Sequence, residues 1–185
     1  MLLLLFCFVT SRIADAYLHL EGFETQVLKH QKIDVDEIQS PRLEEVAAHK
    51  AKQAYAAVQK PVLVEDVALS FAGLDGLPGP FIKFFITIDD GLEKMCRIAD
   101  VFETRQATGE CVYAYYDGER LELFHGRLDG KIADAPKGDN GFGWDAIFCP
   151  EGYSGRTRAE LTDKEYDAVY LQIKPIDKVR AFLNS

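Results

Sequence analysis

Apolar residues are spread along the whole chain, and their spacing changes from segment to segment in a way that predicts alternating strands and helices. Leu2–Val9 is a continuous apolar run of the length of a fully buried strand. A short amphipathic stretch follows at Ile13–Leu20. From Leu43 to Val58 apolar residues recur at helical spacing, and the preceding Ser40 and Pro41 predict an N-cap and a first helical position.

The middle of the chain predicts a strand that carries acids. Pro61–Val64 is a short apolar run that leads directly into Glu65 and Asp66. This pattern predicts a buried strand that delivers two carboxylates to its end, where α/β folds place their chemistry. A helix is expected from Asp90 to about Val101.

The second half predicts a hairpin and a broken helix. Asp117-Gly118 separates the strand-like segments Cys111–Tyr116 and Arg120–His125, which is a strong hairpin signal. The stretch Thr162–Leu183 is typical of a helix, interrupted at Pro175. Interspersed helices and strands predict an α/β or α+β fold with a mixed sheet.

Length and charge narrow the function classes. The chain has 185 residues, of which 48% are hydrophobic, and it contains no repeat or linker, so a single domain is expected. The 21 lysines and arginines are outnumbered by 30 aspartates and glutamates, which gives a net charge of -9. Such a surface repels polyanions, so nucleic acid and anionic membrane are not expected partners. A phosphate-bearing ligand would need a few well-placed cations or a metal.

The cysteines and the apolar start bear on localisation. The four cysteines lie far apart with no CxxC pair, which indicates reduced thiols and a cytoplasmic protein. The apolar run at the start is about half the ~18 residues that a membrane span needs. Ala14–Ala16 resembles a signal-peptide cleavage site, but no lysine or arginine precedes the run. A buried strand is therefore the favoured interpretation and a signal peptide the alternative.

Two acidic side chains are candidate metal ligands. Glu37 lies in an acidic segment, and Asp66 follows the apolar run. Magnesium binds hard carboxylate oxygens, usually one or two from the protein, while water and substrate phosphate complete its octahedron. The alternative is that Glu37 is an ordinary surface acid. A charge that follows an apolar strand must face solvent, a helix N-terminus or a ligand.

Three basic residues and one aromatic segment are further candidates for ligand binding. Arg12, Lys50 and Lys83 stand next to apolar segments rather than in a charge run, as phosphate-binding residues would, although snorkelling of the long stems is the alternative. Phe142–Asp145 holds two aromatic rings separated by glycine. It can present a ring to a planar ligand and a carboxylate to orient it, or it can be a turn that enters the core.

The residues alone leave the function class open. The chain contains no GxGxxG, HExxH or GxSxG pattern and no P-loop. Spacing does not choose between a kinase-like, a phosphatase-like and a non-catalytic protein. Composition and periodicity indicate metal-assisted phosphate chemistry and nothing more specific.

Six segments, taken together and in order, resemble the inosine triphosphate pyrophosphatases, the Ham1-like family that hydrolyses non-canonical purine nucleoside triphosphates. They are Phe8–Thr10, Ile33–Gln39, Pro61–Asp66, Gly76–Lys83, Phe124–Arg127 and Phe142–Asp145. The resemblance runs from residue 1 to about 165. It implies an α/β, two-lobed domain over residues 1–185, with a mixed central sheet flanked by helices and a nucleotide cleft between the lobes. A homodimer is also implied.

The resemblance further implies an activity and a set of site residues. Family members cleave between the α- and β-phosphates with Mg²⁺ and release the monophosphate and pyrophosphate. Glu37 and Asp66 would hold the metal, and Asp66 would also orient or deprotonate the attacking water. Lys50 and Lys83 would contact phosphates, and the base and sugar would be bound by Phe142, Gly143, Trp144 and Asp145.

The phosphate-binding side departs from the family pattern. The family motif Thr-Gly-Asn-x-x-Lys corresponds here to Thr10, Ser11 and Arg12, with Asp15 in place of the lysine. Arg12 is the candidate to supply the missing charge, because an arginine fork suits phosphate. Val67 stands where the family has threonine or serine, which removes a hydroxyl donor.

The base-binding side departs as well. The family reads Glu-Lys-Asn-x-x-Ser-His-Arg near its C-terminal end, where lysine, histidine and arginine meet the purine. Here Tyr166, Leu171 and Gln172 stand in place of those three residues. A pocket that reads a keto group depends on such donors, so an altered base specificity is expected. The sequence thus predicts a Mg-dependent pyrophosphohydrolase; a catalytically impaired nucleotide-binding or regulatory paralogue is the alternative.

Overall fold

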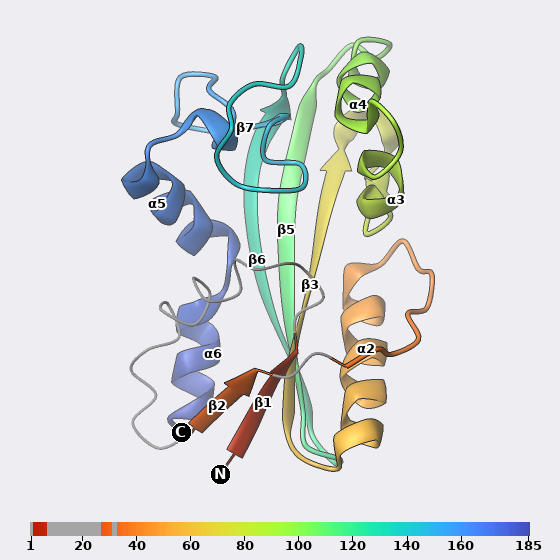
Figure 1. Ribbon diagram of the computed structural model, residues 1–185, viewed down its shortest axis with the longest axis vertical. Coiled ribbons are helices and arrows are strands. Elements are labelled where there is room, and N and C mark those ends of the chain that lie inside the picture. The colour runs from red at the N-terminus through yellow and green to blue at the C-terminus, as the bar shows by residue number, and fades with distance from the viewer. Residues whose placement is uncertain (1, 7–26, 31–32) are drawn as a thin grey trace. The chain divides into compact units, whose positions relative to one another are not determined.

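The structure is a computed structural model that describes residues 2–6, 27–30 and 33–185. Strands and helices are interspersed along the described chain (Figure 1). The predicted amphipathic stretch Ile13–Leu20 and the end of the predicted strand, residues 7–9, lie outside the described residues. Among the described residues, no helix has both the length and the apolar character that a membrane crossing requires.

The strands form one mixed sheet, as predicted. They are β1 (Leu2–Phe6), β2 (Val27–His30), β3 (Val62–Phe71), β4 (Pro78–Gly79), β5 (Gln106–Tyr116), β6 (Leu121–Ile132) and β7 (Phe148–Pro150). In the described part of the sheet the order is β2-β1-β3-β5-β6-β7, with β4 paired to β3. Strand β1 runs parallel to β2 and β3, whereas β4 and β7 run antiparallel to β3 and β6.

The chain divides into two compact units. The first unit contains residues 1–66, 111–125 and 175–185, and the second contains residues 67–110 and 126–174. Strands β3, β5 and β6 are long enough to contribute to both units. The division agrees with the expected two-lobed α/β fold.

The first unit packs two helices against its strands. Helix α2 (Leu43–Val58) and helix α6 (Ile176–Leu183) flank the strands of this unit (Figure 1). The start of β3, residues 62–64, is fully buried. Phe182 of α6 packs its ring 5.0 Å from that of Tyr115 and 5.3 Å from that of Phe124, so an aromatic cluster anchors α6 to the hairpin.

The second unit repeats this arrangement with other helices. Helices α3 (Ile82–Ile86) and α4 (Gly91–Ala99) lie on one side of its strands and α5 (Asp163–Ile173) on the other (Figure 1). Two 3₁₀ turns, η1 (Ala72–Leu74) and η2 (Arg158–Glu160), complete its elements. Ile147 and Phe148 are fully buried in its core.

Local sequence signals predicted several elements correctly. Strands β5 and β6 meet at the Asp117 turn, where the amide of Asp117 donates to the carbonyl of Arg120, which confirms the hairpin. The C-terminal helix is divided into α5 and α6 at Pro175, as predicted. Helix α4 confirms the helix expected after Asp90.

The predicted start of α2 is wrong by two residues. The N-cap is Arg42 and the helix begins at Leu43. The Ser40 hydroxyl accepts from the amide of Arg42 at 3.1 Å and donates to Glu45 at 2.6 Å. The serine therefore stabilises the turn before the helix, and Pro41 stays outside it.

The predicted end of β3 is also wrong. Glu65 and Asp66 lie in the middle of a ten-residue strand, which continues to Phe71. Beyond the acids, Ala68, Leu69 and Phe71 are buried. Their burial favours a paired, extended backbone that continues past Asp66.

Candidate functional site

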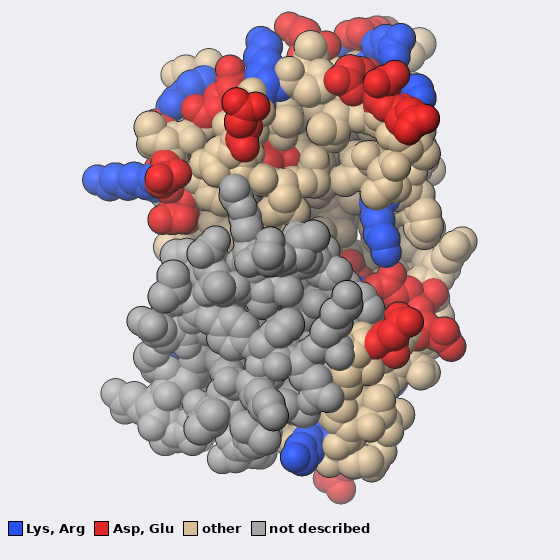
Figure 2. Space-filling model, viewed as in Figure 1, with Lys and Arg blue, Asp and Glu red and all other residues tan. Residues whose placement is uncertain are grey.

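A buried lysine lies between two acids in the first unit. The Nζ atom of Lys50, in α2, lies 2.8 Å from Oε1 of Glu37 and 2.9 Å from Oδ2 of Asp66 in β3. Glu37 belongs to the segment before α2, over which acidic side chains gather in the space-filling view (Figure 2). The two predicted metal-binding carboxylates therefore converge on one point, which is occupied by an ammonium group.

Helix α2 places this lysine. Lys50 shares the buried face of the helix with Val46, Ala47 and Ala54 at helical spacing, and its side chain is only 4% exposed. The aliphatic stem packs in the core while the amine reaches the carboxylates and lies 3.5 Å from the carbonyl of Glu65. Such burial of a lysine requires charged partners.

Electrostatics keep the lysine charged. Burial lowers the pKa of Lys50, but the carboxylates of Asp66 and Glu37 raise it by more, so its pKa lies above the ordinary value. The ammonium group thus balances one of the two negative charges at the point of convergence. The net charge of the three groups is negative, which favours a second cation nearby.

The donor set suits a hard cation. The described residues contain no cluster of three or more histidines, cysteines, aspartates or glutamates arranged to hold a metal. Magnesium needs fewer protein ligands, since water and substrate phosphate fill most of its octahedron. The carboxylates of Glu37 and Asp66, whose side chains remain 34% and 17% exposed, fit this requirement.

The second cluster, in the other unit, is built on the predicted aromatic segment. Phe142 is 45% exposed, whereas Trp144 is 7% exposed and meets the ring of Phe148 edge-on at 5.3 Å. Phe142 therefore lies at the surface, whereas Trp144 enters the core, as the alternative interpretation of the segment expects. Gly143 between them has a positive φ of 62°, which glycine adopts without steric cost.

Asp145 organises this segment from inside. It is 2% exposed, and its Oδ2 accepts from the amide of Phe142 at 2.9 Å and from the hydroxyl of Tyr166 at 2.8 Å. Its Oδ1 accepts from Nη1 of Arg158 at 2.6 Å. The structure thus assigns Asp145 a role in holding Phe142 in place. We call Phe142–Asp145, the segment that the resemblance predicts to bind the base, the base grip from here on.

Arg158 was missed by sequence analysis. It lies between Thr157 and Ala159. No spacing pattern relates it to Asp145, which lies 13 residues earlier. The single available signal is an arginine at the start of a turn whose neighbours are apolar or small.

The other predicted residues occupy varied places. Tyr166 joins the base grip, whereas Leu171 is half exposed and Gln172 lies 3.4 Å from the hydroxyl of Tyr153. Lys83 is exposed on α3, and Val67 is half-buried in β3 beside Asp66. Thr10, Ser11 and Arg12 lie outside the described residues.

A family model and two curated relatives match most of the chain. The model described as "Ham1 family" matches residues 11–182. The inosine triphosphate pyrophosphatase of Yarrowia lipolytica is 42% identical over 160 residues, 84% of this chain and 82% of the relative. That of Giardia intestinalis is 39% identical over 185 residues, 97% of this chain and 92% of the relative.

A solved structure agrees with the fold. The HAM1 protein of Coxiella burnetii superimposes with a TM-score of 0.83 at 26% identity, covering 99% of this chain and 98% of that one. The superposition extends over the α/β architecture of both chains.

Proposed function

Because the chain belongs to the Ham1 family, we propose that it is a nucleoside triphosphate pyrophosphohydrolase, a hydrolase that cleaves the α-β anhydride to a monophosphate and pyrophosphate. One observation carries this proposal: Glu37 and Asp66 converge on the Nζ atom of Lys50 at 2.8 and 2.9 Å. The inosine triphosphate pyrophosphatases among its relatives support the substrate class.

The two carboxylates supply the hydrolytic centre of the proposal. Glu37 and Asp66 would hold Mg²⁺, which when bound neutralises charge on the phosphates. Asp66 orients the attacking water and accepts its proton as the water oxygen bonds to phosphorus and the bridging oxygen departs with its electron pair. Lys50 directs both carboxylates to one point, because its ammonium group pairs with each of them.

Cations and the base grip provide the rest of the substrate contacts. Lys83, exposed on α3, contacts a phosphate in this proposal, as does Lys50 through its ammonium group. Phe142 stacks its exposed ring on the base. Phosphoryl transfer depends mainly on positioning and charge neutralisation, which a chain of net charge -9 must achieve locally.

Base specificity differs from that of the family pattern in this proposal. Tyr166 occupies the position of the family lysine, and its hydroxyl is directed to Asp145. Leu171 brings no hydrogen-bond donor, and the Gln172 amide contacts Tyr153. A site with fewer donors for a keto purine discriminates less strongly against other bases.

The test is a panel of canonical and modified nucleoside triphosphates, including the inosine, xanthosine and adenosine forms, with and without Mg²⁺. Pyrophosphate release that requires the metal is the expected result. Folded protein that releases no pyrophosphate from any member of the panel overturns the proposal.

The second candidate is a nucleotide-binding protein without catalysis. It is favoured by Asp15 and Val67, each of which removes a favourable contact to phosphate relative to the family pattern. Thermal stabilisation by nucleotide that is equal in wild type and Asp66→Asn, without product in either, supports this candidate. Turnover in wild type that is lost in Asp66→Asn with binding retained supports the enzyme.

Two expectations remain predictions: the homodimer that the resemblance implies, and the cytoplasmic location that the cysteines indicate. Sedimentation of the purified chain measures the first, and fractionation of cells that express it measures the second.

A further inference from the structure

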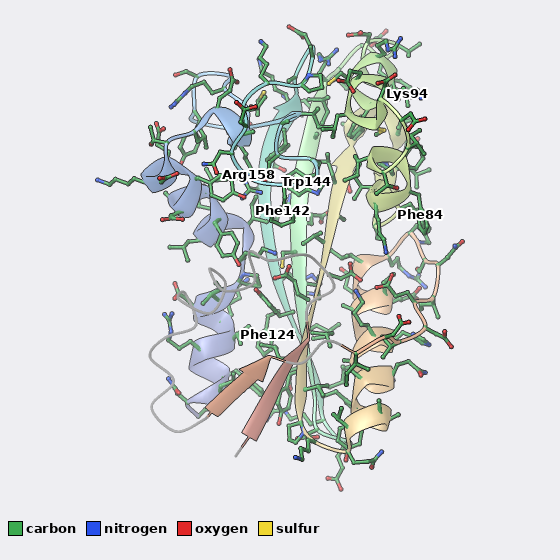
Figure 3. The ribbon with its side chains drawn as sticks, in the orientation of Figure 1. Phe84, Lys94, Phe124, Phe142, Trp144 and Arg158 are labelled. Atoms are coloured by element: carbon green, nitrogen blue, oxygen red, sulfur yellow. The ribbon has the colours of Figure 1, made fainter. Side chains whose placement is uncertain are left out.

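Arg158 is a buried cation that the proposed hydrolysis does not use. It is 7% exposed and begins η2, where the Thr157 amide donates to Oε2 of Glu160 at 2.8 Å and the Thr157 hydroxyl donates to the carbonyl of Lys137. These contacts fix the backbone on both sides of the arginine. Arg158, Trp144 and Phe142 lie in the same region of the view with side chains drawn (Figure 3).

The guanidinium group contacts two residues of the base grip and the neighbouring Tyr166. Its Nη1 donates to Oδ1 of Asp145 at 2.6 Å. Its central carbon lies 4.7 Å from the ring centroid of Tyr166 and 5.6 Å from that of Trp144, within the range of a cation-π contact. Arginine suits these contacts because its planar guanidinium group stacks on aromatic rings while it pairs with a carboxylate.

A chain of contacts leads from Arg158 to the exposed ring. One oxygen of the Asp145 carboxylate accepts a hydrogen bond from Arg158. The other oxygen accepts from the amide of Phe142 and the hydroxyl of Tyr166. Removal of the arginine charge leaves a carboxylate that is 98% buried without this cation, since Asp145 is 2% exposed. A buried carboxylate without its cation is unfavourable and shifts its position, so the amide of Phe142 loses a fixed acceptor.

Stability alone does not explain this arginine well. Within the described residues, the Nε atom of Arg158 is buried and has no hydrogen-bond partner. An unsatisfied buried donor is unfavourable, and each such group in a native structure calls for an explanation. The unsatisfied Nε atom is therefore a cost that the ion pair of Arg158 with Asp145 must offset.

The family pattern has a lysine at the position that faces Arg158, and this chain does not. The position where the resemblance expects a lysine holds Tyr166, whose ring lies against the guanidinium group. In this chain Arg158 of η2 supplies a positive charge beside Asp145.

We propose that Arg158 is a positioning residue that acts through Asp145 to hold the ring of Phe142, and so sets the affinity and selectivity for the nucleotide base. This inference rests on the proposed function. Arg158 contacts the base grip, so its loss is expected to affect binding of the base more than the hydrolytic step.

The test compares three variants. Arg158→Met removes the charge with a similar stem, and Arg158→Lys restores a charge. Arg156→Met is the matched control, because Arg156 lies two residues away and pairs with Glu165 at 3.0 and 2.5 Å. Each variant is assayed on inosine and adenosine triphosphate with Mg²⁺, and its Tm is measured without nucleotide.

The expected result is a rise in KM with little change in kcat. Arg158→Met raises KM about 10-fold or more while kcat changes less than about 3-fold, and the selectivity between the two bases shifts by about 10-fold. Arg158→Lys recovers part of each change, and Arg156→Met shows neither. Unchanged KM and selectivity in Arg158→Met, or a loss that follows Tm equally for both substrates, overturns the proposal.

Fluorescence separates this proposal from the proposed function. Trp144 is the one tryptophan in the chain, so its emission reports on the base grip directly. If wild type releases no pyrophosphate, titration of Trp144 emission with inosine triphosphate gives a Kd, and the same 10-fold weakening is expected in Arg158→Met. An equal Kd in wild type and Arg158→Met, or the absence of any titration in wild type, overturns the role of Arg158.

Discussion

The ammonium group of Lys50 lies 2.9 Å from Oδ2 of Asp66, and the lysine side chain is only 4% exposed. This contact joins the middle of α2 to the middle of β3. It places a positive charge where two carboxylates would otherwise repel each other. The pair therefore affects both the stability of the first unit and the geometry of the proposed metal ligands.

Lys50→Met is expected to destabilise the protein by about 3 kcal/mol, because removal of one partner from a buried ion pair leaves the others without compensation. Urea unfolding measures the loss. Lys52→Met is the matched control, since Lys52 is exposed on the same helix, and a change within about 0.5 kcal/mol is expected there. Equal effects of the two substitutions contradict the role assigned to Lys50.

The Lys50 ion pairs predict a loss of stability at alkaline pH. Because the pKa of Lys50 is raised above its ordinary value of 10.5, its contribution is fully present below 10.5 and is lost as pH rises through the folded-state pKa. Unfolding free energies measured between about pH 9 and pH 12 are expected to fall more steeply for wild type than for Lys50→Met. Parallel curves for the two proteins would show that Lys50 does not contribute.

Asp66→Asn is expected to lower kcat about 100-fold or more, because the amide neither takes the proton of the attacking water nor supplies an anionic metal ligand. Nucleotide binding, followed by thermal shift, is retained. Glu65→Gln is the matched control on the same strand, where alternation directs neighbouring side chains to opposite faces. A comparable loss of kcat in both variants contradicts the assignment to Asp66.

Gly141→Ala is expected to destabilise the base grip. Gly141 has a φ of 81°, and a Cβ there would collide with the carboxylate of Asp145. Gly152 has a similar φ of 86° but open space within 4 Å, so Gly152→Ala isolates the backbone cost of about 1 kcal/mol. Gly141→Ala is expected to cost about 3 kcal/mol in total. Urea unfolding compares the two, and equal costs would show that the contact with Asp145 is unimportant.

Local signals predicted much of the fold. Asp117 and Gly118 marked the hairpin turn and Pro175 marked the break between α5 and α6, because turn conformation and proline geometry are set by a few adjacent residues. The start of α2 was placed wrongly at Ser40, since a serine hydroxyl can stabilise a preceding turn as well as a helix N-terminus.

The candidate site was predictable in part. The resemblance pointed to Glu37, Asp66 and the base grip, and the structure brings the two acids to one point. The resemblance did not indicate that Lys50 lies between the two acids, or that Arg158 pairs with Asp145. Thr10–Arg12 lie outside the described residues, so the phosphate-binding prediction stays a prediction.

The amino-acid sequence by itself determined the order of strands and helices, the acidic surface charge and the family to which the motifs point. Those features depend on composition and on neighbours a few positions apart. The tertiary structure alone decided which charges meet: Lys50 pairs with Asp66 across 16 residues and Arg158 with Asp145 across 13. Such pairs form only when folding buries both partners together, because a buried charge is stable only beside an opposite one.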